Sequence, residues 1–172
     1  MINISLVWYA GPSDTRDLDQ YVRRQWASAD YLNKEFGVVE GGLTGGNGYW
    51  SLGSFFTYVD RVHAAGRNIL LGANTLSNNQ QRDYNLACYM LLTDGVDMID
   101  DSLTTLANWY WVYDADFGRP LGDRYMWNGL FRRDFENGII LVNEPSASTK
   151  TVSLDGNFLN TSNNVSSFLK NF

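Results

Sequence analysis

The sequence predicts an α/β fold in which a parallel sheet of βαβ units precedes a small antiparallel β unit. Short apolar runs alternate three times with segments whose apolar residues recur at helical spacing, and this alternation is typical of right-handed βαβ series. Near the C-terminus, Asn137-Gly138 separates two apolar runs, which indicates an antiparallel hairpin. With 172 residues, 44% of them hydrophobic, the chain is long enough to bury one substantial core.

The first predicted strand and helix come from the N-terminal 35 residues. We expect a strand over 4–10 and, after a Gly-Pro break, a helix over 15–35 with Asp14 or Thr15 as its N-cap. The helix prediction depends on apolar residues at helical spacing: Leu18, Tyr21, Val22, Trp26 and Ala29.

Two further strand and helix pairs follow. Residues 36–40 (FGVVE) and 67–73 (RNILLGA) are short apolar runs that predict buried strands. The helical patterns lie at 51–66, ended by Gly66, and at 78–95, ended by Gly95. A last parallel strand is expected in the five residues after Gly95 (VDMID), which completes the βαβ series.

The C-terminal part has a different character. Residues 108–127 contain seven aromatic residues among twenty without a helical or two-residue period, and we interpret them as an ordered loop. Strands are predicted on both sides of Glu136-Asn137-Gly138 within 129–144, and a third strand at 149–154 (TKTVSL). The predicted division is therefore 1–127 for the α/β part and 128–172 for the antiparallel unit, whose tail is rich in Asn and Ser.

Composition excludes several classes of function. The formal net charge of −6 leaves no basic surface for nucleic acid, and no apolar stretch approaches the length of a membrane span. Cys88 lies in an apolar run, as a buried structural thiol does, and His63 is the single imidazole. We therefore expect neither a metal site nor a cofactor. A signal peptide is not visible, so the chain is expected to be soluble, and its compartment is open.

Acidic and amide side chains follow the predicted parallel strands. Glu40 ends the strand at 36–40, Asn74 follows the next strand, and Asp100 and Asp101 follow the last one. The carboxyl ends of neighbouring parallel strands share one face, so these side chains are expected to converge. Two carboxylates at such a face suit the cleavage of a glycosidic bond, one as acid and the other as base or nucleophile.

Aromatic residues near these acids predict sugar platforms, because indole and phenol faces stack on the C–H surface of a pyranose. Glycines between residues 41 and 48 allow the loop after Glu40 to bend over a ligand. The candidate substrate-binding residues, with Asn74 above, are Tyr49, Trp50, Trp109, Trp111, Asp114 and Asp116.

Each candidate also has a plainer interpretation. Glu40 would serve equally as a loop carboxylate that pairs with Arg67 or Arg119. One of Asp100 and Asp101 would cap a short helix that begins at Ser102.

The aromatic loop and the glycines have alternatives as well. Asp114 and Asp116 would bind a cation or hold their loop through Asx turns, and the tryptophans would pack in a core. The glycines after Glu40 lack the spacing of a phosphate-binding loop.

Several segments resemble the C-terminal half of (β/α)8-barrel glycoside hydrolases that carry an appended β-sandwich hairpin. The run 84–99 resembles the helix and strand of that family, residues 113–122 (YDADFGRPLG) its aromatic loop, and 129–144 its first sandwich hairpin. The run 36–42 (FGVVEGG) resembles a barrel strand that ends in an acid. The matching residues in the loop and hairpin are Asp116, Gly118, Pro120, Leu121, Gly122, Arg133, Phe135, Gly138, Leu141, Val142 and Asn143.

The resemblance implies a partial (β/α) barrel-like parallel sheet followed by the small antiparallel β unit, with Glu40 at an acidic barrel-mouth position. A complete barrel needs about 250 residues. The chain is therefore expected to be a fragment, a reduced relative, or a half-barrel completed by another copy.

Two hypotheses about function follow. In the first, the protein is glycoside hydrolase-like and acts on or binds a carbohydrate. In the second, it is a non-catalytic structural or assembly module built on a truncated hydrolase fold, as a component of an oligomer, filament or particle. Its expected partner is a second copy of the chain or the missing barrel half.

Overall fold

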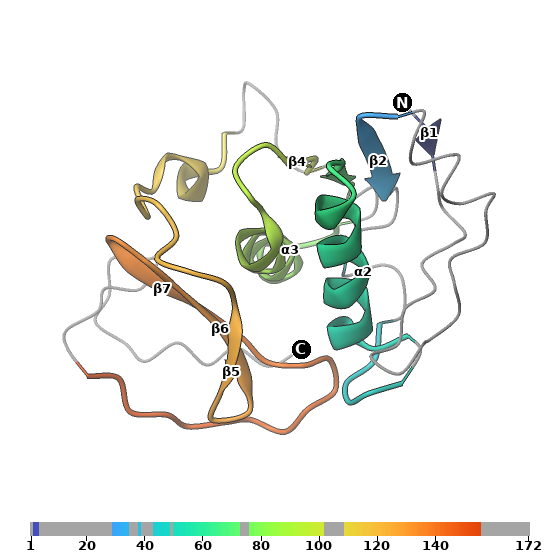
Figure 1. Ribbon diagram of the computed structural model, residues 1–172. Coiled ribbons are helices and arrows are strands. Elements are labelled where there is room, and N and C mark those ends of the chain that lie inside the picture. Colours follow the sequence, from blue (N-terminus) through green and yellow to red (C-terminus); the bar gives the residue numbers. More distant parts are fainter. Residues whose placement is uncertain are drawn as a thin grey trace.

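A computed structural model describes residues 2–3, 29–34, 38, 43–48, 50–72, 76–101 and 109–155. Within these ranges two α-helices alternate with strands of a parallel sheet, and an antiparallel sheet follows them in the chain (Figure 1). The predicted α/β class with a separate antiparallel unit is confirmed. None of the helices in these ranges has both the length and the apolar character needed to cross a bilayer.

The parallel sheet has four described strands, whose order in space is their order in the chain. They are β1 (Ile2–Asn3), β2 (Tyr31–Lys34), β3 (Asn68–Leu71) and β4 (Met98–Ile99). Every neighbouring pair is parallel. The predicted strands at 67–73 and after Gly95 are confirmed, and the strand predicted at 4–10 lies outside the described residues.

The strand between β1 and β3 was predicted in the wrong place. Tyr31–Lys34, assigned to the end of the helix at 15–35, pairs residue by residue with Asn68–Leu71. Val38, in the middle of the strand expected at 36–40, lies in a turn instead. Pairing with β3 and burial of Leu32, 2% exposed, override the helical spacing of this short segment. Residues 15–28 and the N-cap candidates Asp14 and Thr15 lie outside the described ranges.

Both predicted helices past residue 50 are confirmed. The first, α2 (Leu52–Ala64), begins at Ser51, whose hydroxyl accepts a hydrogen bond from the Ser54 amide at 3.1 Å. The second, α3 (Asn79–Leu92), begins at Asn78, whose side-chain oxygen accepts from the Gln81 amide at 2.9 Å. It ends three residues before the predicted Gly95, because the backbone at Thr93 is already extended.

The antiparallel sheet contains the predicted hairpin, β6 (Leu130–Phe135) and β7 (Gly138–Val142). Its third strand, however, is β5 (Tyr125–Trp127) and not 149–154, which forms no strand. The cause is a second Asn-Gly pair, since Asn128 and Gly129 both have positive φ, as a tight hairpin turn requires. A short 3-10 helix, η1 (Trp111–Asp114), precedes this sheet within the predicted ordered loop.

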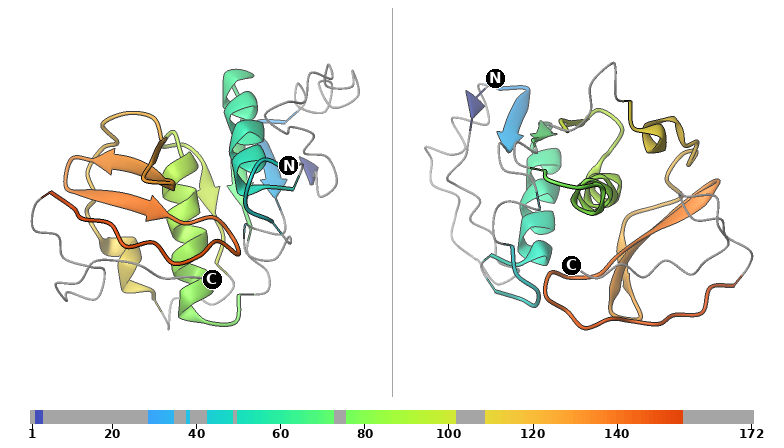
Figure 2. Two further views of the ribbon diagram at one scale, coloured as in Figure 1. Left: turned by 90° about the horizontal axis from the view of Figure 1, so that it is seen from below. Right: turned by 180° about the vertical axis from the view of Figure 1, so that it is seen from behind.

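The helices lie between the two sheets (Figure 1 and Figure 2). Ile69 and Leu71 of β3 and Ile140 and Val142 of β7 belong to one buried cluster, together with Phe55 of α2. Arg133 of β6 reinforces the contact, because its guanidinium donates hydrogen bonds to the carbonyls at the C-terminal end of α3. The predicted boundary at 127/128 falls in the turn between β5 and β6, inside the antiparallel sheet, and the two sheets share a core.

Candidate functional site

Three of the predicted site residues, Glu40, Tyr49 and Asn74, lie outside the described residues. The candidate site is therefore built from the residues that follow β4 and from the helix α3 beside them. These bring Asp101 together with the aromatic loop that contains Trp109 and Trp111.

Asp101 and Arg82 form a buried ion pair at the carboxyl end of β4. Arg82 stands in the first turns of α3, and its Nε lies 2.9 Å from Asp101 Oδ2. The two side chains are only 6% and 3% exposed. Nε nevertheless has no hydrogen bond of good geometry, so the contact is chiefly electrostatic. Tyr113 completes the group, because its hydroxyl donates to Asp101 Oδ2 at 3.0 Å.

Tyr110 lies against the other side of Arg82. The guanidinium carbon is 4.4 Å from the centre of the Tyr110 ring, which is a cation–π distance. The Tyr110 hydroxyl donates a hydrogen bond to Asp83. Burial raises the pKa of Tyr110 above its usual value, and the bond to Asp83 raises it further. Tyr110 is therefore a neutral donor that fixes the loop to α3.

Exposed and buried side chains alternate over residues 109–112, and this alternation leaves Trp109 and Trp111 exposed. Tyr110 is 8% exposed, whereas Trp109 is 54% and Trp111 47% exposed. The Trp109 indole donates to Asp114 at 3.0 Å, and its ring centre is 5.5 Å from that of Tyr113. We call Trp109 and Trp111 the aromatic ledge. Its members are exposed, but the residues around them hold their backbone in place.

The other predicted acids of this region, Asp100, Asp114 and Asp116, each make contacts of their own. Asp100 is exposed and adjoins Asp101, and its backbone amide continues the pairing of β4 by donating to Leu71 at 2.9 Å. Asp116 accepts a hydrogen bond from the Gly118 amide at 2.9 Å, which is the Asx turn considered above. Asp114 holds Trp109. Both Asp114 and Asp116 are exposed, and Asp114 is the one that contacts the ledge.

Trp50 belongs to a different loop, which precedes α2. It is 51% exposed, and its carbonyl closes the loop by accepting from the Thr44 amide at 2.9 Å. Glu144 accepts a hydrogen bond from the Gly46 amide of the same loop. This loop and η1 lie apart in all three views (Figure 1 and Figure 2). Trp50 is thus not part of the aromatic ledge.

Arg82, Tyr110 and Tyr113 organise the site but are not among the residues predicted from the sequence. One signal was present. A cation in the first turns of a helix and an acid after the next strand are neighbours in a βαβ unit, because the helix begins where the strands end. That signal predicts a pair of the kind Arg82 and Asp101 form.

Comparison with known proteins assigns neither a family nor a function to the chain. No protein-family model matches the chain, and no curated protein matches its sequence.

Proposed function

We propose that the protein is glycoside hydrolase-like and binds a carbohydrate on the aromatic ledge. The observation that supports the proposal best is the pair of half-exposed indoles at Trp109 and Trp111, held by buried neighbours. Indole faces stack on pyranose C–H groups, and a fixed side chain loses little conformational entropy when a ligand binds.

In this proposal, carboxylates of the same loop supply the polar half of sugar recognition. Asp114 and Asp116 are exposed and are each oriented by a hydrogen bond, to Trp109 and to the Gly118 amide respectively. Carboxylate oxygens accept hydrogen bonds from sugar hydroxyls with charge assistance. In this proposal the rings set the plane of the sugar and the acids fix its rotation.

Hydrolysis is the finer part of the proposal and requires two carboxylates about 5 to 10 Å apart. Asp101 is buried against Arg82, so its role is to position the ledge through Tyr113. Asp100 is exposed on the same turn and is the better partner for Glu40. The parallel order β1-β2-β3-β4 supports a (β/α)8-barrel origin, in which strand-end acids face the substrate.

The binding proposal is tested by affinity electrophoresis against a panel of soluble polysaccharides, with Trp109→Ala and Trp111→Ala variants. Each variant should weaken binding about twofold to tenfold, since loss of one stacked ring removes roughly 0.5–1.5 kcal/mol. Trp50→Ala is the matched control, because Trp50 is equally exposed but lies on another loop. Retention of full affinity in both ledge variants would contradict the proposal.

Catalysis is tested separately on any polysaccharide that binds. Glu40→Gln and Asp100→Asn should each abolish release of reducing ends while the affinity is kept, because an amide can neither transfer a proton nor attack as a carboxylate does. Unchanged hydrolysis in Glu40→Gln would remove Glu40 from the mechanism. Binding without any hydrolysis in the unmodified protein would leave a carbohydrate-binding module.

A second candidate function is assembly, and exposed apolar side chains around β5 favour it. Leu121, Tyr125 and Met126 are 68%, 43% and 54% exposed, and β5 is an edge strand of its sheet. Met126→Lys should then dissociate an oligomer seen by sedimentation velocity. A protein that sediments as a monomer at high concentration would exclude this candidate.

A further inference from the structure

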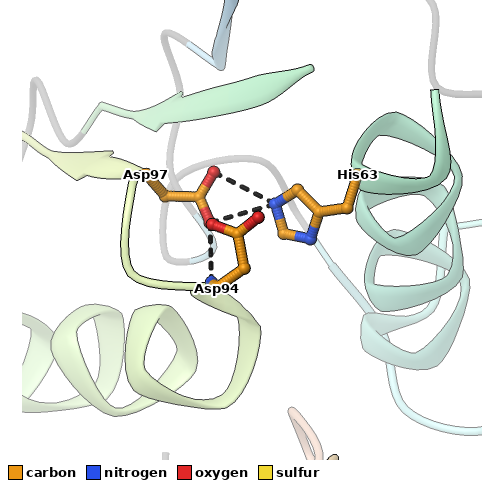
Figure 3. A group of neighbouring side chains, drawn as sticks. All are labelled: His63, Asp94 and Asp97. Atoms are coloured by element: carbon orange, nitrogen blue, oxygen red, sulfur yellow. Dashed lines mark hydrogen bonds and ion pairs between the residues drawn. The ribbon is translucent and has the colours of Figure 1, made fainter. Parts of the chain in front are cut away.

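A second group of reactive side chains lies at the opposite end of the parallel strands from the aromatic ledge. His63 stands in the last turn of α2, and Asp94 and Asp97 belong to the loop between α3 and β4 (Figure 3). Asp97 directly precedes β4, so the group marks the amino end of that strand. It takes no part in the proposed sugar site.

The geometry of the group is tightly constrained around Asp97. Its side chain is 0% exposed, and His63 Nε2 lies 3.0 Å from each of its two oxygens. The Ile69 amide donates to Oδ1 at 2.8 Å, and the Asp94 amide lies 3.3 Å from Oδ2. One ligating atom from each of His63, Asp94 and Asp97 can be chosen so that all lie within 4.8 Å of one another.

We propose that His63, Asp94 and Asp97 form a binding site for a divalent transition-metal ion of the Zn²⁺ type. Ligands that bind Zn²⁺ at about 2.1 Å in tetrahedral geometry are roughly 3.4 Å apart. His63 Nε2 and the Asp97 oxygens are 3.0 Å apart, which is shorter than this spacing, so the imidazole has to move back slightly and give up its hydrogen bond when the ion binds. Asp94 is exposed, so it can close the remaining gap by a change of rotamer, and water completes the coordination.

The charges around His63 favour a cation at this position. Asp97 contacts the imidazole at 3.0 Å, and the carboxylates of Asp94 and Asp60 act on its charge as well. One imidazole with two carboxylates is a ligand set for Zn²⁺ or its first-row neighbours. Ca²⁺ and Mg²⁺ prefer oxygen ligands alone.

The site would act as a structural clip. His63 ends α2, Asp97 begins β4, and the amide of Ile69 in β3 holds the same carboxylate. An ion that bridges His63 and Asp97 therefore ties a helix end to two strands. In the competing interpretation no metal ion binds, and the hydrogen bond between His63 and Asp97 alone joins the helix to the strand. We call this arrangement the clasp, and the experiment must distinguish it from a metal site.

The experiment measures Zn²⁺ uptake by an untagged protein. Because His63 is the only histidine in the sequence, the ¹H–¹³C signals of one imidazole report on the site without ambiguity. The expected result is saturable uptake of one Zn²⁺ per chain, a shift of these signals that EDTA reverses, and no response to Mg²⁺. At a free Zn²⁺ concentration of 100 times the Kd, the ratio of folded to unfolded protein should rise about 100-fold.

Asp94→Asn is the informative variant, because it removes an exposed ligand and leaves the hydrogen bond between His63 and Asp97 in place. It should weaken Zn²⁺ binding at least about tenfold. Asp155→Asn makes the same charge change at an exposed site elsewhere and should bind as the unmodified protein does. His63→Gln should also lose binding while it keeps a donor for Asp97. Absence of saturable uptake, or uptake that Asp94→Asn leaves unchanged, would overturn the metal site and leave the clasp.

Discussion

Individual residues in this protein owe their roles to burial more than to identity. Asp101 and Asp100 are adjacent in the sequence and chemically identical, yet Asp101 is 8% exposed and paired with Arg82 while Asp100 is exposed. A buried carboxylate needs a cation because its desolvation is costly, whereas an exposed one keeps its water. The same rule separates Tyr110, which is packed under Arg82, from its neighbours Trp109 and Trp111.

The Arg82 pair makes a prediction at this scale. Arg82→Met should destabilise the protein by about 3–5 kcal/mol, because it leaves the buried Asp101 without its cation. The double variant Arg82→Met/Asp101→Leu should recover much of that loss, since both desolvated charges are gone. Urea denaturation measures the free energies of unfolding. Additive losses in the double variant would show that the two residues do not act as a pair.

Elements in this fold begin and end where particular backbone geometries are met. Ser51 and Asn78 cap the two helices, and glycines at positive φ occupy turns on both sides of the helical layer. Gly66 has φ of 70° and open space around it, while Gly118 has φ of 69° and lies against Glu136. The two glycines thus share a conformation but differ in their surroundings.

Substitution by alanine should distinguish these two glycines. Gly66→Ala should cost roughly 1–2 kcal/mol, the penalty of a left-handed backbone for a residue with a Cβ. Gly118→Ala should cost about 1–3 kcal/mol more, because its new Cβ would lie 2.7 Å from the Glu136 Cβ. The comparison is made by urea denaturation of both variants. Equal losses would mean that Glu136 moves aside freely.

At the scale of the whole molecule, the two sheets behave as one structure because they bury the same helices. Arg133 is the chief polar link, with hydrogen bonds from its guanidinium to Met90 at 3.0 Å, Thr93 at 2.7 Å and Gly122 at 3.1 Å. Phe135, Ile140 and Val142 extend the cluster that contains Leu32 and Leu71. We therefore expect one cooperative unfolding transition.

Arg133→Lys tests this link. Lysine cannot reproduce the planar fork, so the variant should lose about 2–4 kcal/mol of stability as the carbonyls of Met90, Thr93 and Gly122 lose their donor. Arg119→Lys is the control, because Arg119 is 87% exposed in its pair with Glu136 and should change stability by less than about 1 kcal/mol.

The cooperativity itself is checked by following circular dichroism and tryptophan fluorescence through the same urea titration. The two curves should coincide in the unmodified protein. Separate midpoints would instead support independent domains at 1–127 and 128–172.

The sequence by itself determined the elements that depend on local chemistry. Apolar spacing located α2 and α3, the pair Asn137-Gly138 located one hairpin, and strand and helix alternation predicted the parallel sheet. The first two signals are complete within a short segment, and the alternation is a series of such segments.

Only the tertiary structure decided the features that join distant segments. Tyr31–Lys34 became a strand because β3 offered its edge, and the Arg82–Asp101 pair formed because α3 begins where β4 ends. His63 and Asp97 meet across 34 positions of the sequence. No local pattern records such contacts, since their free energy comes from burial and charge pairing that exist only after the chain has folded.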